Sequence, residues 1–324
     1  MINKRQYIML SFFLTRALFL GGCFSLLVKL TKNSMLIAGG IGMLVGYFLL
    51  YLLFKMKDSV SSIIKVMICI VILLINTLSS NMLTSNYLLS NTPTLFILLF
   101  FFIVLLYGKS KKMEVIGRVS EIVIILSVLV YVLGYVGIST NIEISKMLPI
   151  MNSKFFDVIK GIVIFSSASL LPNILLLDYK ENLKFKDISI GYVIGSISIL
   201  LIMFFILTIY GSELSSIARF PEYLILKKVN IMNYITNLEN VLVMEWIVNI
   251  IICCLFSIKV LFNNMKNVKV LFYVIIFILF MVCELFLFKN YSYVLVVKNY
   301  VYYGCFILVI LSLFIRKKKT TNLD

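Results

Sequence analysis

Long apolar runs separated by short polar segments make up nearly the whole chain. About 20 apolar residues are enough for a helix to cross the hydrocarbon core of a bilayer. The pattern predicts ten such helices, at about residues 7–28, 35–54, 61–89, 92–107, 119–136, 155–177, 188–210, 234–262, 268–288 and 293–315. The sequence therefore indicates an all-α, polytopic membrane protein that forms a single transmembrane domain over residues 1–324.

Composition supports a membrane protein and changes how the charge is interpreted. Hydrophobic residues make up 62% of the chain and charged residues 14%, whereas soluble domains carry about 45–50% and 25%. The net charge of +16 comes mainly from short segments between the runs and from the basic tail, residues 316–324. Cytoplasmic loops of membrane proteins are enriched in Lys and Arg, so we expect membrane lipid and no nucleic acid as a partner, with both termini cytoplasmic. The first run is interpreted as a retained helix.

The ten predicted helices divide into two halves, residues 7–137 and residues 155–315. Each half has an odd number of helices, so the two halves must have opposite orientations in the membrane. The long third helix of the first half corresponds to the long third helix of the second. This correspondence predicts a five-plus-five inverted-repeat fold of the kind found in secondary transporters.

The first helix of each half contains residues that weaken a helix. Gly21 and Gly22 follow one another in the first, and "IFSSASLLPN" places Ser166, Ser167, Ser169 and Pro172 in the sixth. If both helices are broken there, free N–H groups and serine hydroxyls can bind the carboxylate of an amino acid. The alternative is that the glycines permit close helix packing and the serines bond to their own helix.

Arg16, next to Thr15, stands inside the first apolar run. It lies roughly 14 Å beyond Tyr7 along the helix, and a central arginine costs about 3 kcal/mol to insert. Such a residue normally faces the interior of the bundle and has a partner. The possible partners are Glu121, Glu245 or an anionic ligand. Arg16 is therefore either a structural ion-pair residue or part of a ligand or coupling site.

The segment 212–234, between the seventh and eighth helices, is too polar to span a membrane and too apolar for a free linker. Its spacing of Leu and Ile predicts helical pieces with a break before Pro221. They form either an external lid over a ligand vestibule or a surface helix without a gating role.

Residues typical of catalysis and metal binding are scarce. The chain has no histidine, and its six cysteines all fall within apolar runs. Nucleotide-binding glycine motifs and catalytic triads are missing from the sequence. We therefore expect no enzymatic activity, no cofactor and no metal.

Several short motifs, in a fixed order, resemble the B-subunit family of spore-germination nutrient receptors, within the amino acid, polyamine and organocation transporter superfamily. They are "KRQ" at residues 4–6, "GRVSEI" at 117–122, "KMLPI" at 146–150, "LLPN" at 170–173 and "FPEYLILKKVNIMNYITNLENVLVMEW" at 220–246. The resemblance implies an inverted-repeat fold, a germinant such as an amino acid, and A- and C-type partner subunits in the spore inner membrane. Its binding residues fall on Thr15, Arg16, Gly21 and Gly22, and on Phe165, Ser166, Ser167 and Ser169.

The first helix departs from the family pattern. The family's G-x-G pair aligns with Ala17 and Phe19, and Arg16 replaces an uncharged residue. The departure indicates a changed ligand or a site that binds none. Three functions follow: a nutrient-sensing receptor subunit, a stand-alone proton- or sodium-coupled amino acid transporter, or a scaffold subunit that binds no ligand.

Overall fold

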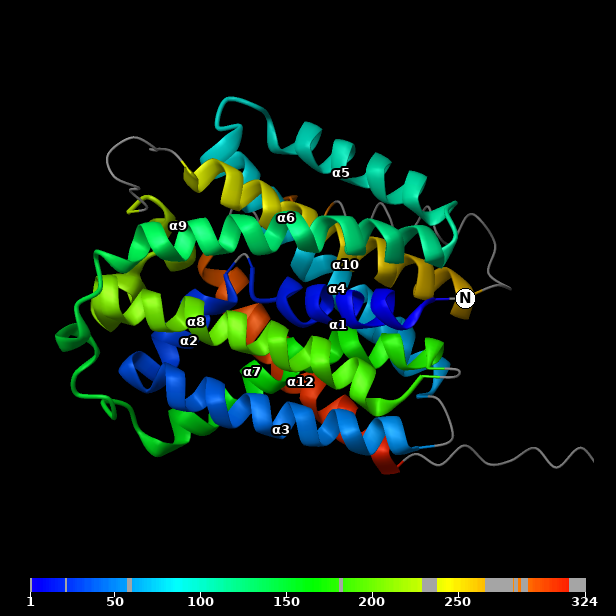
Figure 1. Cartoon of the computed structure of the whole chain (residues 1–324), viewed down its shortest axis with the longest axis horizontal. Helices are drawn as coiled ribbons and strands as arrows, with labels where there is room; N and C mark the ends of the chain where they lie inside the picture. Colours follow the sequence, from blue (N-terminus) through cyan, green and yellow to red (C-terminus); the bar gives the residue numbers. More distant parts are fainter. Residues whose placement is uncertain are drawn as a thin grey trace, which may run out of the picture.

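The protein is a bundle of long helices in the part of the chain that the structure describes (Figure 1). The computed structural model describes residues 2–20, 22–56, 60–180, 183–228, 238–265, 282, 285–286 and 291–314. The longer helices are α1 (Lys4–Ala17), α2 (Cys23–Thr31), α3 (Met35–Lys55), α4 (Ser62–Leu83), α5 (Thr94–Lys109), α6 (Met113–Ser139), α7 (Phe155–Leu176), α8 (Phe185–Ile217), α10 (Leu238–Asn264) and α12 (Tyr291–Phe314). Short helical elements are η1 (Lys32–Ser34), η2 (Thr84–Leu88), η3 (Ile144–Met147), η4 (Leu177–Tyr179) and α9 (Pro221–Leu226).

Helices occupy the predicted spans wherever the structure describes them, except that the first span is non-helical between Ala17 and Cys23. The predicted helix at 268–288 lies almost entirely outside the described residues, and so does the basic tail. Helix α6 begins at Met113, six residues earlier than predicted, so Glu121 lies well inside it. Within the described ranges, seven helical stretches are long and apolar enough to cross a membrane, and Thr94–Gly108 is a shorter apolar helix.

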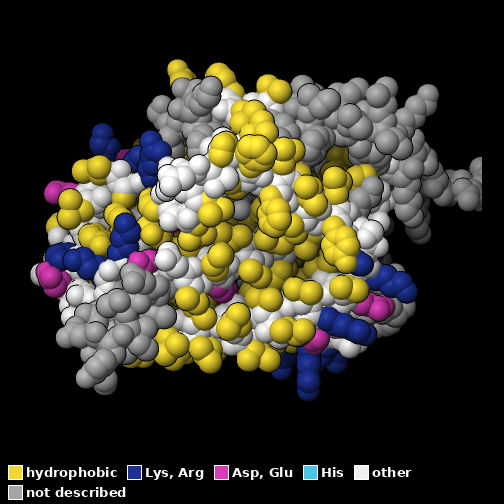
Figure 2. Space-filling view, turned by 90° about the horizontal axis from the view of Figure 1, so that it is seen from above, with side chains coloured by type: hydrophobic (Ala, Val, Ile, Leu, Met, Phe, Trp, Pro, Cys, Tyr) yellow, Lys and Arg dark blue, Asp and Glu magenta, His cyan; other side chains and the backbone are white. Residues whose placement is uncertain are grey.

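The outer surface of the bundle is apolar between two charged ends. Figure 2 shows hydrophobic side chains across the middle of one face and Lys, Arg, Asp and Glu towards both ends. Large side chains such as Phe100 and Ile125 are 71% and 73% exposed on α5 and α6. A soluble protein rarely exposes a continuous apolar surface of this extent. The chain is an integral membrane protein.

Helix α1 lies in the centre of the bundle. Its side chains Tyr7, Phe13 and Leu14 have no exposed surface, and the helix packs on α6, α7, α8 and α10. Its most extensive contact is with α8, while the most extensive contact of α3 is with α7. Helix α1 also packs on α6, and α7 also packs on α12.

The predicted break in the sixth span is wrong, because α7 is continuous from Phe155 to Leu176 with Pro172 inside it. Two of the three serine hydroxyls turn back onto their own helix: Ser166 Oγ donates to Val163 O at 3.1 Å, and Ser169 Oγ donates to Phe165 O at 3.0 Å. Hydroxyls bonded in this way satisfy the helix locally and do not require it to open.

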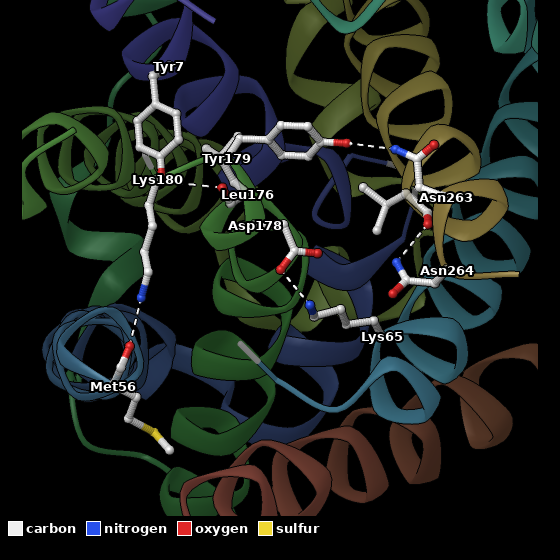
Figure 3. Close-up of polar contacts among 10 residues, drawn as sticks. Tyr7, Met56, Lys65, Leu176, Asp178, Tyr179, Lys180, Asn263 and Asn264 are labelled. Carbon is white, nitrogen blue, oxygen red and sulfur yellow. Dashed lines mark hydrogen bonds and ion pairs between the residues drawn. The ribbon is translucent and has the colours of Figure 1, made fainter. Parts of the chain in front are cut away.

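Polar contacts tie the helix ends together at the end of the bundle where the N-terminus lies (Figure 3). Lys65 Nζ on α4 is 2.5 Å from Asp178 Oδ1 on η4, and Tyr7 Oη on α1 donates to Leu176 O at 3.3 Å. Other contacts drawn join Lys180 Nζ to Met56 O at 2.7 Å, Asn263 Nδ2 to Tyr179 Oη at 3.2 Å, and Asn264 Nδ2 to Val260 O at 2.8 Å. Burial lowers the pKa of Lys180, although the nearby Asp178 carboxylate opposes this shift. This end is closed.

The Lys65–Asp178 pair is expected to stabilise the fold measurably. The side chains are 5% and 22% exposed, so Lys65→Met should leave a half-buried carboxylate and cost about 1–2 kcal/mol, between the values for surface and buried pairs. Thermal unfolding of the detergent-purified protein measures this. The matched control is Lys160→Met, which breaks the more exposed Lys160–Asp157 pair and should change little. Equal effects of both substitutions would contradict the prediction.

Candidate functional site

The polypeptide is non-helical between α1 and α2, as the glycine pair predicted. Helix α1 ends at Ala17, and the N–H groups of Phe19 and Leu20 donate to Arg16 O at 3.0 and 3.4 Å. Gly22 has φ +114°, a left-handed conformation that favours glycine, and precedes α2 directly. Gly21 lies outside the described residues. Non-helical backbone at membrane depth needs other partners, and Tyr302 Oη on α12 supplies one by donating to Leu18 O at 3.3 Å.

Arg16 is completely buried and forms a charged cluster with α6 and α10. Its Nη2 donates to the hydroxyl of Tyr131, which in turn donates to Glu245 Oε2 at 2.5 Å. Its Nη1 lies 3.8 Å from Glu245 Oε1, which also accepts a hydrogen bond from Ser127 Oγ at 2.7 Å. We call Arg16, Ser127, Tyr131 and Glu245 the Arg16 cluster. It is a neutralised buried pair in which a tyrosine hydroxyl bridges the two charges.

Of the two predicted acidic partners, the structure selects Glu245 and not Glu121. Glu121 Oε2 accepts a hydrogen bond from Gln6 Nε2 at 3.3 Å, near the start of α1. Gln6 lies ten residues before Arg16, about 15 Å along an α-helix. Aromatic rings complete the surroundings of the guanidinium, whose Cζ lies 4.2 Å from the Tyr131 ring centroid and 4.9 Å from that of Phe12.

Thr15 lies on a different side of α1 from Arg16. Its Oγ1 donates to Ser11 O at 2.7 Å and accepts from Asn173 Nδ2 on α7 at 2.9 Å. Its side chain also lies against Gly195 on α8. These contacts connect α1 to α7 and α8, whereas Arg16 connects α1 to α6 and α10.

The predicted residues of α7 are buried, and two of them contact the non-helical stretch or its partner. The Phe165 ring packs on Phe19 with centroids 4.9 Å apart. Ser167 Oγ donates to the backbone of Tyr302 at 3.0 Å, the residue that bonds Leu18. Ser169 Oγ lies 2.9 Å from Tyr192 Oη on α8. The structure thus brings Phe165 and Ser167 close to the interruption, while the other serines bond within α7 and to α8.

Sequence analysis missed two charged residues beside Gly22. Glu222, fully buried on α9, accepts a hydrogen bond from the Gly22 N–H through Oε1 at 3.2 Å. Lys298, 4% exposed on α12, donates from Nζ to Ser79 Oγ on α4 at 3.1 Å. A Cβ on Gly22 would lie 3.3 Å from that Nζ. Lys298 sits within an apolar run, which is the signal that identified Arg16, whereas Glu222 lies in a short polar segment without such a signal.

A small cavity separates the Arg16 cluster from α9. Its volume is about 20 Å³, space for about one water molecule. Tyr131 and Glu222 both line it, and so do Tyr135 and Trp246. In the described part of the chain, Tyr135 Oη and Trp246 Nε1 are buried without a hydrogen-bond partner. Buried polar groups of this kind are normally satisfied. The surface of the cavity itself is apolar, so these two donors do not face it.

Helix α9 closes this cavity at the end of the bundle opposite the N-terminus (Figure 1). Its Ile225 and Leu226 line the cavity together with Glu222. The predicted interruption before Pro221 is present, because α8 ends at Ile217 and α9 begins at Pro221. Residues 229–237, the rest of the predicted lid segment, lie outside the described residues.

Fold and site together define a polytopic helical membrane protein with a buried polar centre beside an interrupted helix. The spore germination protein family model matches residues 34–292, most of the chain, and the protein belongs to that family of membrane permeases. The matched range includes Tyr131, Glu222 and Glu245 but begins after α1 and α2. A search of curated proteins finds no match to this chain.

Proposed function

We propose that the protein is a spore-germination nutrient-receptor subunit that senses a free amino acid in the cavity next to the Arg16 cluster. The observation that carries the proposal is a cavity lined by Tyr131, Tyr135 and Trp246, of which Tyr135 Oη and Trp246 Nε1 are buried without a hydrogen-bond partner in the described part of the chain. Arg16 and Glu245 offer opposite charges next to this wall, which suits a zwitterion. In this proposal the cavity is in its contracted state in the structure and expands when α9 moves. The protein carries out no enzymatic step.

The proposal includes the five-plus-five inverted-repeat fold. An inverted repeat equates α1 with α7, α3 with α8, and α6 with α12. Under this exchange the α1–α8 contact becomes the α7–α3 contact, and the α1–α6 contact becomes the α7–α12 contact. Both contacts of each pair occur, which supports the repeat. The uninterrupted α7 breaks the symmetry, so we place the ligand beside α1 and α2, with Gly22, Phe165 and Ser167 near it and Thr15, Ser166 and Ser169 supporting the helices.

The family membership also supports the assembly and location that we propose. The subunit works with A- and C-type receptor subunits in the spore inner membrane, with both termini cytoplasmic. In this orientation the end of the bundle drawn in Figure 3 faces the cytoplasm and α9 faces outward. A ligand then reaches the cavity from the α9 side.

Trp246 makes the proposal directly testable, because it is the single tryptophan of the chain and lines the cavity. A panel of free amino acids, tryptophan excluded, is titrated into the detergent-purified protein. We expect at least one of them to shift the fluorescence of Trp246 saturably. The same compound should raise the melting temperature, with about 2.7 kcal/mol of stabilisation at 100 times the dissociation constant. Trp246→Phe should weaken that thermal shift, since phenylalanine lacks the N–H.

The controls separate the proposed receptor from the two alternatives. Arg16→Ala should abolish the response, while Lys160→Ala, on the exposed end of α7, should preserve it. If no amino acid changes either signal, the protein is the scaffold that binds no ligand. If the protein alone accumulates the bound amino acid in liposomes under a proton or sodium gradient, it is the stand-alone transporter.

A further inference from the structure

We propose that Glu222 is an internal latch: its carboxylate, bound to the N-terminus of α2, holds α9 closed over the cavity. The contact joins Glu222 Oε1 to the Gly22 N–H at 3.2 Å, across 200 positions of sequence. The latch itself does not depend on ligand binding; only its role in controlling ligand access rests on the proposed function.

The position of Glu222 explains why the carboxylate is stable without exposure to water. The N-terminus of a helix carries partial positive charge and free N–H groups, so it attracts an anion. Gly22 and α2 provide that terminus, and the Lys298 ammonium lies against the same glycine. The carboxylate therefore lies in a buried, electropositive position.

The latch acts through α9, because Glu222 stands at the beginning of this short helix. The same helix contributes Ile225 and Leu226 to the cavity wall. Two other contacts hold α9: the ring centroids of Tyr87 and Tyr223 lie 3.9 Å apart, and Tyr210 Oη donates to Leu224 O at 3.0 Å. These contacts hold α9 against its neighbours. Glu222 is the charged contact of α9 with the non-helical stretch between α1 and α2.

The consequence for sensing is competition. Glu222 lines the cavity and is bound to the Gly22 N–H, so a ligand carboxylate in the cavity must displace Glu222 to reach the N-terminus of α2. Its binding and the closed position of α9 therefore oppose one another until the carboxylate of the ligand replaces that of Glu222. The apparent affinity then depends on how often the latch is open.

Cys23 reports on the latch without any ligand. It is fully buried beside Gly22, and a variant that keeps only this cysteine has Cys69, Cys253, Cys254, Cys283 and Cys305 replaced by alanine. We expect Glu222→Gln to raise the rate of Cys23 modification by a charged, water-soluble thiol reagent about tenfold, because the substitution removes a charge-assisted contact at a helix N-terminus. The matched control is Glu213→Gln, an exposed glutamate on α8, which should leave the rate unchanged.

Two further measurements keep the test decisive. If Glu222→Gln alone lowers stability, the double variant Glu222→Gln/Lys298→Met removes both charges beside Gly22 and should still react faster. A Cys23 rate within about twofold of the parent in both folded variants, with full reaction after denaturation, would overturn the latch.

The amino acid titration shows whether the latch controls ligand access. For a compound that shifts Trp246 fluorescence, Glu222→Gln should lower the apparent dissociation constant about tenfold, in step with the thiol rate. If Glu222→Gln raises the rate of Cys23 modification but leaves the dissociation constant unchanged, Glu222 is a latch that does not control ligand access. A faster thiol rate with no responding amino acid would instead contradict the proposed function.

Discussion

Replacing Glu245 by leucine should lower the free energy of unfolding by about 3–5 kcal/mol, the cost of leaving one partner of a buried ion pair alone. Arg16 has no exposed surface, and Glu245 is its nearest carboxylate among the described residues, at 3.8 Å. The substitution also removes the acceptor of the Tyr131 and Ser127 hydroxyls. Reversible unfolding in mixed detergent micelles, followed by circular dichroism, measures the change.

The double variant Arg16→Met/Glu245→Leu distinguishes a structural pair from a functional one. It removes both charges and should recover most of the stability that Glu245→Leu loses, since apolar replacements of buried pairs are often neutral. It should not recover the response to amino acids, because the charges that suit a zwitterion are gone. Glu213→Leu, on an exposed position of α8, should change stability by less than about 0.5 kcal/mol. A double variant as unstable as the single one would contradict this account.

The sequence predicted the helices well because membrane insertion imposes a strong constraint on every span. Each helix must hide its backbone polar groups and present apolar side chains over about 30 Å, so its run is visible without tertiary information. The same logic made Arg16 conspicuous, and the structure places it in an ion pair with a residue predicted as its partner. It also made Gly22 a credible interruption, because a glycine pair lowers helix stability locally.

What the sequence did not predict depends on which side chains meet in space. Pro172 and three serines suggested a break in α7, but the helix is continuous and two of the hydroxyls bond to its preceding turn. Composition cannot distinguish these two outcomes. Glu222 lies in a segment that does not span the membrane, where an acidic residue carries no insertion cost. The sequence therefore does not single it out as a functional residue. Its bond to Gly22 joins residues 200 positions apart, and only the packing of α9 reveals it.

Gly191→Ala is expected to separate α1 from α8 and lower the free energy of unfolding by about 3 kcal/mol, the upper end of the usual cost of overpacking. A Cβ at Gly191 would lie 2.3 Å from Ile8 O and 3.0 Å from Phe12 N, both backbone atoms of α1. A flexible side chain can rotate away from an added methyl group, but a helix backbone moves only as a unit. The melting temperature of the purified variant measures the effect.

The matched control is Gly40→Ala, on α3, where a Cβ would meet no atom within 4 Å. This substitution should be neutral or slightly stabilising, because alanine is favoured over glycine in a helix interior. Comparing the two variants also tests the site, because Arg16 lies on α1 two turns beyond Ile8. A shift of α1 would therefore move Arg16 relative to α6 and α10. If Gly191→Ala shifts α1, the Arg16 cluster must loosen, and the Trp246 emission spectrum should change even without a ligand. An unchanged spectrum with an unchanged melting temperature would show that α1 and α8 pack less closely than the structure indicates.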